Sequence, residues 1–387
     1  MAITVLVTDA NLAVVGDPIV CWMSVDCTAR FNAVGSGVLT VPAYPWIREQ
    51  IQASHRVVVI RDRRIFLAGP IEQTTVEQSD DGENSGIGTL TVDFADDLAW
   101  VAARITFPNP AQEPDDWLVD DWTATSVNAE QILHNLVNLN AGPGALAARR
   151  VPALTLGDLQ GIGNTITMTT RLEPLVEVLR RVASNGGGLG FRTRQVGNTI
   201  EFQTYQPQDL SGEVRFGFGL GNLRHLAYER SAPTATTVLV GGQGEGTARF
   251  VTSRTNTIGE TVWGRTEKLV ARSGDDAIGE LEQAGDEALV EEAETVRLQS
   301  SAWDTDTQRY PDDYDLGARV SIQVGPGEEV SDLVRLVHLQ AWATAGELVS
   351  AMVGSQEASN DPQWVQRMRA LDRRLGHLER ITAPTSA

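Results

Sequence analysis

Two aspartate clusters are the residues of this chain best suited to chemistry. Asp304 and Asp306 stand in DTDT, and Asp312, Asp313 and Asp315 follow in PDDYD. Two carboxylates at a defined separation can hydrolyse a glycosidic bond. Several loop oxygens can instead bind calcium. The same run is also typical of a solvated loop between a helix and a strand, which is the interpretation that we favour.

Histidine and nucleophile patterns give no support to an enzyme. The five histidines form no HExxH motif and no pair four residues apart: His55, His134, His225, His338 and His377. The sequence also lacks a GxSxG elbow. We therefore predict no catalytic residue, no cofactor and no metal site.

Two glycine-rich segments resemble phosphate-binding loops only superficially. They are FGFGLGN, with Gly217, Gly219 and Gly221, and GGQGEG, with Gly241, Gly242, Gly244 and Gly246. A phosphate loop needs a helix N-terminus directly after its glycines. A strand-like segment follows Gly246, and no helix is evident after Gly221. Both segments are predicted to be structural turns.

Tryptophan and cysteine offer weaker candidates. Trp117 and Trp122 lie in the acidic stretch DDWLVDDWT and could form a sugar-stacking or partner-binding surface, although packing under a loop is the favoured alternative. Cys21 and Cys27 have neither disulfide-framework nor zinc-site spacing. We expect both to be buried free thiols.

Composition excludes several classes of protein. The 387 residues are 42% hydrophobic, enough for two or three compact domains. The net charge of −20 argues against a sequence-specific nucleic-acid binder, although it does not exclude a protein that DNA merely passes through. The apolar runs are too short for a membrane helix, and the N-terminus is expected to be a strand rather than a signal peptide. Lys268 is the only lysine among 31 basic residues, which suggests a GC-rich, actinobacterial or actinophage source.

The first hundred residues are predicted to form a β domain. Expected strands are Ile3 to Thr8, Ile19 to Phe31, Val38 to Val41, Val57 to Arg61, Arg64 to Val76 and Ile87 to Phe94, with a hairpin turn at Asp62-Arg63 and a short helix from Pro45 to Ala53. Residues 101–223 are predicted to be an inserted domain. It has a helix after Ser126 as N-cap, a second helix from Glu173 to Ser184, and strands at Gly190 to Arg194 and Asn198 to Tyr205.

Residues 224–354 are predicted to form a second β domain. A strand, the GGQGEG turn and a returning strand span Pro233 to Val251, and strands follow at Ala318 to Val324, Val334 to Trp342 and Leu348 to Val353. Asp275 to Glu294 is expected to form an amphipathic helix whose inner stripe contains Ile278, Leu281, Ala288, Leu289 and Val296.

Residues 355–387 are predicted to be a polar linker and an amphipathic helix. Trp364, Met368, Leu371, Leu375 and Leu378 are spaced four, three, four and three residues apart, which is a heptad seam. Two heptads are compatible with an intermolecular coiled coil and equally with a helix packed on its own domain.

The segments PTATTVLVGGQGEGTARFV and YPDDYDLGARVSIQV resemble the minor tail proteins of siphophages that infect actinobacteria. In that family a strand ending in GGQGEG and a Tyr-Asp-Leu-Gly turn before a strand recur. FNAVGSGVLTVP and LEPLVEVLRRVASNGGGLGF extend the resemblance in looser form. It implies an α+β, mainly β fold, with two tail-tube-like β domains, an inserted helix-containing domain and a C-terminal helix. It also implies that Tyr314, Asp315 and Gly317 form a structural turn.

The resemblance implies a structural virion protein, namely a tail-tip hub assembled in the host cytoplasm, most simply as a homotrimer. Its expected partners are the distal tail protein, the tape measure and receptor-binding or spike proteins, with DNA only in transit and no stable membrane association. The Trp364 to Leu378 seam and the Gly241 to Gly246 turn are the expected assembly elements. Two alternatives stay open: a cell-wall hydrolase that uses the Asp304 to Asp315 loop, and the hub of a bacterial contractile injection system.

Overall fold

The computed structural model describes residues 3–78, 88–117, 121–242, 249–271 and 278–354. The chain forms two compact units. Met1–His225 and Ser300–Gly354 make the first unit, and Leu226–Gln299 belong to the second. Both contain antiparallel strands and a few helices, which confirms the predicted mainly β, α+β class. The division into four domains by residue number stays a prediction.

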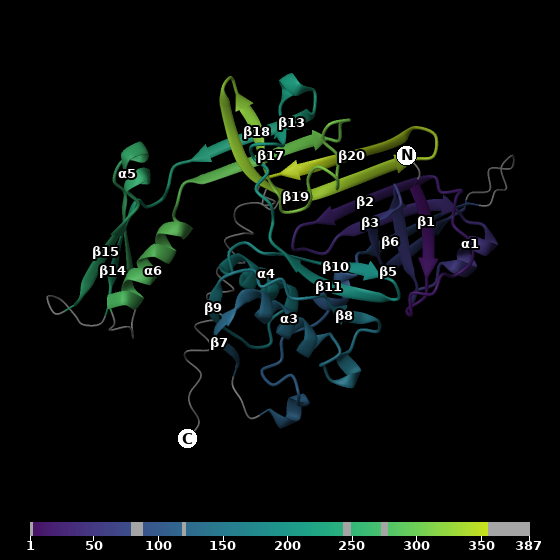
Figure 1. Cartoon of the computed structure of the whole chain (residues 1–387), viewed down its shortest axis with the longest axis horizontal. Coiled ribbons are helices and arrows are strands. Elements are labelled where there is room, and N and C mark those ends of the chain that lie inside the picture. The colour runs from purple at the N-terminus through teal and green to yellow at the C-terminus, as the bar shows by residue number, and fades with distance from the viewer. Residues whose placement is uncertain (1–2, 79–87, 118–120, 243–248, 272–277, 355–387) are drawn as a thin grey trace. The chain divides into compact units, whose positions relative to one another are not determined.

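The N-terminal part of the first unit is β-rich, as predicted (Figure 1). Its elements are β1 (Ile3–Thr8), β2 (Ser24–Arg30), β3 (Ser36–Pro42), α1 (Pro45–Gln50), β4 (Arg56–Arg61), β5 (Arg64–Glu77), β6 (Thr89–Ala95) and α2 (Leu98–Ala102). Asp62 and Arg63 both have positive φ and make the expected tight turn between β4 and β5. The expected strand from Ile19 is wrong in its first part, because Ile19 makes only an isolated bridge to Val5.

Strands from the C-terminal part of the chain continue the same sheet. They are β17 (Thr295–Trp303), β18 (Arg319–Gly325), β19 (Glu328–Trp342) and β20 (Gly346–Val353), with β12 (Arg215–Phe216) beside β18 and β13 (Leu223–Ser231) next to β17. The main path runs β1-β4-β5-β6-β3-β2-β19-β20-β17-β13.

Two long strands connect the parts of this sheet. The first half of β5 pairs with β4 and the second half with β6, with a bulge between Ile71 and Gln73. Likewise β19 pairs with β18 over Glu328 to Leu333, and then with β2 and β20 up to Trp342. The strand β19 therefore joins the N-terminal strands, through β2, to the C-terminal strands β18 and β20.

The middle of the first unit has its own core around two helices, α3 (Ala129–Asn140) and α4 (Leu175–Asn185). The other elements are η1 (Pro114–Asp116), β7 (Trp122–Asn128), η2 (Ala147–Arg149), β8 (Leu154–Leu156), β9 (Thr165–Thr170), β10 (Gly190–Val196), β11 (Thr199–Tyr205) and η3 (Phe218–Leu220). Ser126 is not the N-cap of α3. Asn128 takes that place and accepts from the N–H groups of Glu130 and Gln131, because Ser126 lies within β7, at a bulge where its φ is +53°, and the pairing of β7 continues to Asn128.

The second unit is a three-stranded sheet with one helix on one face. β15 (Val251–Thr255) and β16 (Glu267–Ala271) flank β14 (Thr237–Gly241), and α6 (Ile278–Glu291) packs on β14 and β15 (Figure 1). The short helix α5 (Thr257–Trp263) links β15 to β16. Leu281 and Ala288 of α6 lie in the core of the second unit, as the predicted stripe requires. The inclusion of Val296 in that helix is wrong, because α6 ends at Glu291 and Val296 belongs to β17.

Some predicted assembly residues lie outside the described part of the chain. These are Gly244 and Gly246 of the glycine turn and the whole seam of Trp364, Met368, Leu371, Leu375 and Leu378. Gly241 ends β14 at its pairing with Val251, so the strands on either side of the turn form the predicted hairpin.

Candidate functional site

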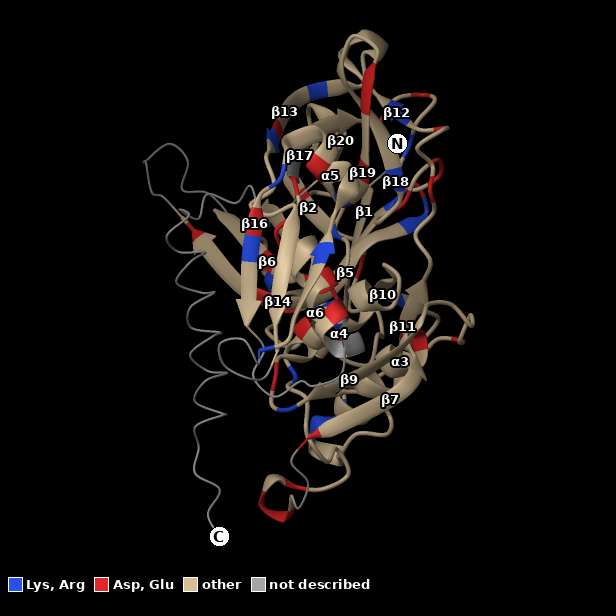
Figure 2. Ribbon diagram, turned by 90° about the vertical axis from the view of Figure 1, so that its left-hand side faces the viewer, with Lys and Arg blue, Asp and Glu red and all other residues tan. Residues whose placement is uncertain are grey.

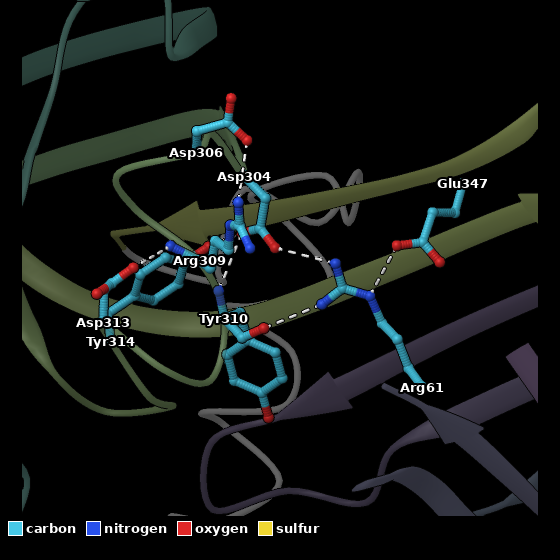
Figure 3. A network of polar contacts seen from close by, with 8 residues as sticks. All are labelled: Arg61, Asp304, Asp306, Arg309, Tyr310, Asp313, Tyr314 and Glu347. Atoms are coloured by element: carbon cyan, nitrogen blue, oxygen red, sulfur yellow. Dashed lines mark hydrogen bonds and ion pairs between the residues drawn. The ribbon is translucent and has the colours of Figure 1, made fainter. Parts of the chain in front are cut away.

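The aspartate clusters share one loop between β17 and β18. This acidic loop, residues 304–318, lies against the end of β4 and the start of β20 (Figure 3). Arg61, the last residue of β4, reaches it with a side chain that is only 8% exposed. A buried arginine at this place requires carboxylate partners.

The guanidinium of Arg61 lies between two carboxylates. Its Nε donates to Oε1 of Glu347 at 3.0 Å, and its Nη2 lies 3.5 Å from Oδ2 of Asp304. Nη1 donates to the carbonyl oxygen of Tyr310 at 3.0 Å. A single side chain thus ties β4 to β20 and to the acidic loop.

Asp304 is held from the loop side as well. Its Oδ1 accepts from the hydroxyl of Tyr314 at 2.8 Å and from the backbone N–H of Tyr310 at 3.2 Å. Burial raises the pKa of Asp304, and these hydrogen bonds and Arg61 act against that rise. Burial first, and then the charge of Asp304, raise the pKa of Tyr314 well above its ordinary value, so this hydroxyl stays a donor.

Each outer aspartate of the loop also has a partner. The pairs are Asp306 with Arg309 at 3.0 Å, Asp312 with Arg64 at 2.6 Å, Asp315 with Arg192 at 2.6 Å, and Asp313 with the backbone N–H of Arg309 at 2.7 Å. Arg64 begins β5 and Arg192 lies on β10. Together with Arg61 of β4, these pairs connect the loop to three strands of the first unit, β4, β5 and β10.

This arrangement differs from that of a hydrolytic carboxylate pair. Such a pair flanks an open space, with one carboxylic acid free to protonate the leaving oxygen. Here the aspartates instead accept hydrogen bonds from arginine side chains, from the hydroxyl of Tyr314 and from backbone N–H groups. Among the described residues, no group of three or more His, Cys, Asp or Glu side chains is placed to hold a metal ion. What this geometry does best is fix the loop.

Tyr314, Asp315 and Gly317 form a tight turn within the loop. The Tyr314 side chain is buried, and its ring packs edge-on against Phe216 at 5.8 Å. Gly317 has a φ of +80°, and a Cβ there would collide with the ring of Phe31. Glycine is thus required by both the backbone conformation and the close contact.

The other sequence candidates have structural surroundings. Gly217 to Gly221 surround the single turn η3, and Gly221 adopts a left-handed conformation. His134 is buried with its Nε2 3.1 Å from the Thr204 hydroxyl, and His338 lies 2.6 Å from Asp26 on the neighbouring strand β2.

The tryptophans of the acidic stretch are half-buried. Trp117 packs edge-on against Phe107 at 4.7 Å and donates to the Gln112 carbonyl, and Trp122 packs against the core of α3 and α4. Cys27 is a buried free thiol. Cys21 is free but only half-buried, so its predicted burial is wrong, because it lies outside β2.

Sequence reasoning missed a pocket of about 440 Å³ beside the acidic loop. Residues 61–68, 191–195 and 309–312 line much of it, and they come from the β4–β5 hairpin, from β10 and from the acidic loop. No single motif marks it, because its wall is assembled from distant segments. Among the helices of the described residues, none has the length and hydropathy needed to cross a membrane.

Three solved tail proteins share this fold. The 43 kDa tail protein of prophage MuSo2 from Shewanella oneidensis matches with a TM-score of 0.57 at 11% identity, covering 92% of this chain and 100% of that chain. A tail protein from Neisseria meningitidis MC58 matches with a TM-score of 0.53 at 12% identity, covering 92% and 97%. Prophage tail protein gp18 from Listeria monocytogenes EGD-e matches with a TM-score of 0.50 at 10% identity, covering 96% and 99%.

No curated protein has a sequence match to the chain. A family model does match, over residues 4–355, and its description is Siphovirus ReqiPepy6 Gp37-like protein. The match covers both compact units and the acidic loop. With the fold of phage tail proteins, this chain belongs to the siphovirus ReqiPepy6 Gp37-like family.

Proposed function

We propose that the chain is a structural protein of the siphovirus tail and forms the hub at its tip. The observation that carries this proposal is the family match over residues 4–355, combined with a fold shared with phage tail proteins. In this role it closes the tail tube, connects it to receptor-binding or spike components and leaves a central path for DNA. The siphovirus family favours a phage tail over a contractile injection system.

The charge of the chain supports a conduit. A wall that binds phosphates would hold the DNA that must pass, whereas a net charge of −20 repels it. Figure 2 shows Lys and Arg positions interspersed with Asp and Glu positions along the ribbon. Several arginines of the first unit are also engaged by aspartates of the acidic loop.

The acidic loop supports a structural role rather than hydrolysis of the cell wall. Its carboxylates are held by Arg61, Arg64, Arg192 and Arg309. Replacing Asp312, Asp313 and Asp315 together with asparagine tests this directly. If purified wild-type protein clears peptidoglycan and the variant does not, the structural proposal fails.

Assembly is proposed to place a homotrimer at the tail tip, in contact with the distal tail protein and the tape measure. The proposed contacts are the Trp364 to Leu378 seam, whose heptad spacing suits a coiled coil, and the turn that starts at Gly241. Tyr314, Asp315 and Gly317 act as the internal turn that shapes the acidic loop.

Light scattering of the purified chain tests the assembly. The full chain is compared with a variant that ends before Trp364. A mass of three chains that falls to one on truncation supports a ring held by its C-terminal helices. A single chain in both samples contradicts self-assembly through the seam.

A further inference from the structure

The pocket beside the acidic loop has a strongly basic wall in an otherwise acidic protein. Six arginines line it, against four aspartates. They are Arg30, Arg61, Arg64, Arg192, Arg194 and Arg309, against Asp62, Asp96, Asp97 and Asp312. We call this cavity the arginine pocket. The chain as a whole has 51 acidic and 31 basic residues, so this local excess of arginine is opposite to the average.

Most of the arginines are already neutralised. Arg61, Arg64, Arg192 and Arg309 each pair with a carboxylate of the acidic loop or β20. Within the described part of the chain, the Arg30 side chain donates to the Val34 carbonyl and the Ser36 hydroxyl. The side chain of Arg194 has no hydrogen bond or ion pair with any residue that the structure describes. Among the described residues, therefore, neither Arg30 nor Arg194 is hydrogen-bonded to a carboxylate.

Among the described residues, no aspartate of the wall forms an ion pair with Arg30 or Arg194, although the charge of Arg30 acts against the rise that burial causes in the pKa of Asp96. Asp97 is fully engaged with the buried Arg56, whose Nη2 lies 2.5 Å from its carboxylate. Asp96 accepts from the backbone N–H groups of Gly35 and Leu98. Arg192 and Arg194 stand two residues apart on β10 and so share a face of that strand. Desolvation first, and then the charge of Arg192, lower the pKa of Arg194, and the charge of Asp315 acts against that fall without reversing it.

Apolar side chains complete the wall. Ile65 and Phe66 of β5 line the same cavity. Ile65 is 42% exposed and Phe66 is half-buried, so these two side chains offer apolar surface to the cavity, whereas Leu67, Phe191 and Leu316 of its lining are buried. Inorganic phosphate would satisfy the arginines but leave these apolar atoms against water. A peptide with a carboxylate beside an apolar side chain would satisfy both.

We propose that the arginine pocket binds an acidic peptide segment of a partner protein, with Arg194 and Arg30 holding a carboxylate and the apolar wall holding a neighbouring side chain. That the partner is another tail subunit rests on the proposed function. The proposed preference of the pocket for an acidic peptide does not rest on that function, because it is argued from the residues that line the pocket. Binding to purified protein and assembly into a hub can therefore fail separately.

Fluorescence anisotropy with the full chain tests this proposal. The probe is a short labelled peptide of glutamate and leucine, and its matched control has glutamine in place of glutamate. We expect the glutamate peptide to bind and the glutamine peptide to bind much more weakly. Arg194→Ala should weaken the glutamate peptide about tenfold or more, as expected for the loss of a charge-assisted hydrogen bond.

Arg48→Ala is the matched control variant. Arg48 is an exposed arginine of α1 that does not line the pocket, so the change in net charge is the same. Circular dichroism checks that each variant is folded. Equal binding of both peptides, equal effects of the two alanine variants, or phosphate binding without binding of the glutamate peptide would each overturn the proposal.

Discussion

Replacing Arg61 with methionine should lower the free energy of unfolding of the first unit by about 3–5 kcal/mol, the usual cost of breaking a buried ion pair from one side. The side chains of Arg61, Asp304 and Glu347 are 8%, 11% and 17% exposed. Methionine keeps most of the aliphatic stem, so packing is largely preserved. The loss in the free energy of unfolding then measures the cost of leaving the carboxylates of Asp304 and Glu347 without the guanidinium of Arg61.

Arg64 of β5 provides a matched control, because it also pairs with an aspartate of the acidic loop. Its ion pair with Asp312 is short, at 2.6 Å, but the two side chains are 62% and 57% exposed. Exposed pairs contribute about 0–1 kcal/mol, so Arg64→Met should be close to neutral. The contrast between the two variants isolates burial as the cause.

Urea denaturation followed by tryptophan fluorescence measures both variants. Glu347→Gln, alone and with Arg61→Met, completes a double-mutant cycle, for which we expect a coupling energy of about 0.5–3 kcal/mol. If Arg61→Met costs no more than Arg64→Met, or if the cycle shows no coupling, Arg61 does not hold the loop as argued.

Further predictions concern three other residues. Burial raises the pKa of Asp96 to about 7, so the folded state binds the carboxyl proton more tightly than the unfolded state does. The free energy of unfolding should therefore fall as the pH rises from about 4 to about 7. Asp96→Asn should remove that part of the pH dependence of the urea midpoint. Gly317→Ala should be more destabilising than Gly327→Ala. Alanine costs about 1 kcal/mol at either position because of the positive φ, but only at Gly317 would its Cβ collide with the Phe31 ring. Equal losses in the free energy of unfolding, measured from urea denaturation curves, would contradict this contact. Glu130→Ala should lower the free energy of unfolding by about 3 kcal/mol in the same assay, and Glu130→Gln should lower it less. The reason is that Glu130 accepts hydrogen bonds from the three backbone N–H groups of residues 160–162 and from the buried hydroxyl of Thr204. An alanine variant as stable as the wild type would refute that role.

Local patterns predicted much of the fold. Alternation of apolar and polar residues located most strands, and the Asp62-Arg63 turn followed from its position between two of them. The cap of α3 was placed two residues early, since Ser126 and Asn128 are both good N-caps and only the pairing of β7 decides between them. Boundaries therefore depended on tertiary pairing.

The site could not be predicted in the same way. The aspartates of the acidic loop are visible in the sequence, but their partners come from β4, β5 and β10. No spacing rule connects Arg61 to Asp304, because the contact exists only once the sheet has formed. Whether such carboxylates are free for chemistry is a tertiary property.

The pairing of β2 with β19 has a consequence for synthesis of the protein. His338 meets Asp26 across a separation of 312 residues. At ribosomal rates of about 5–20 residues per second, the edge of β2 waits roughly 15–60 s for its partner strand. During that time its unpaired N–H and C=O groups can recruit the wrong strand. A nascent chain of this length is thus exposed to misfolding before any virion exists, and its yield should depend on protection of that one edge by chaperones.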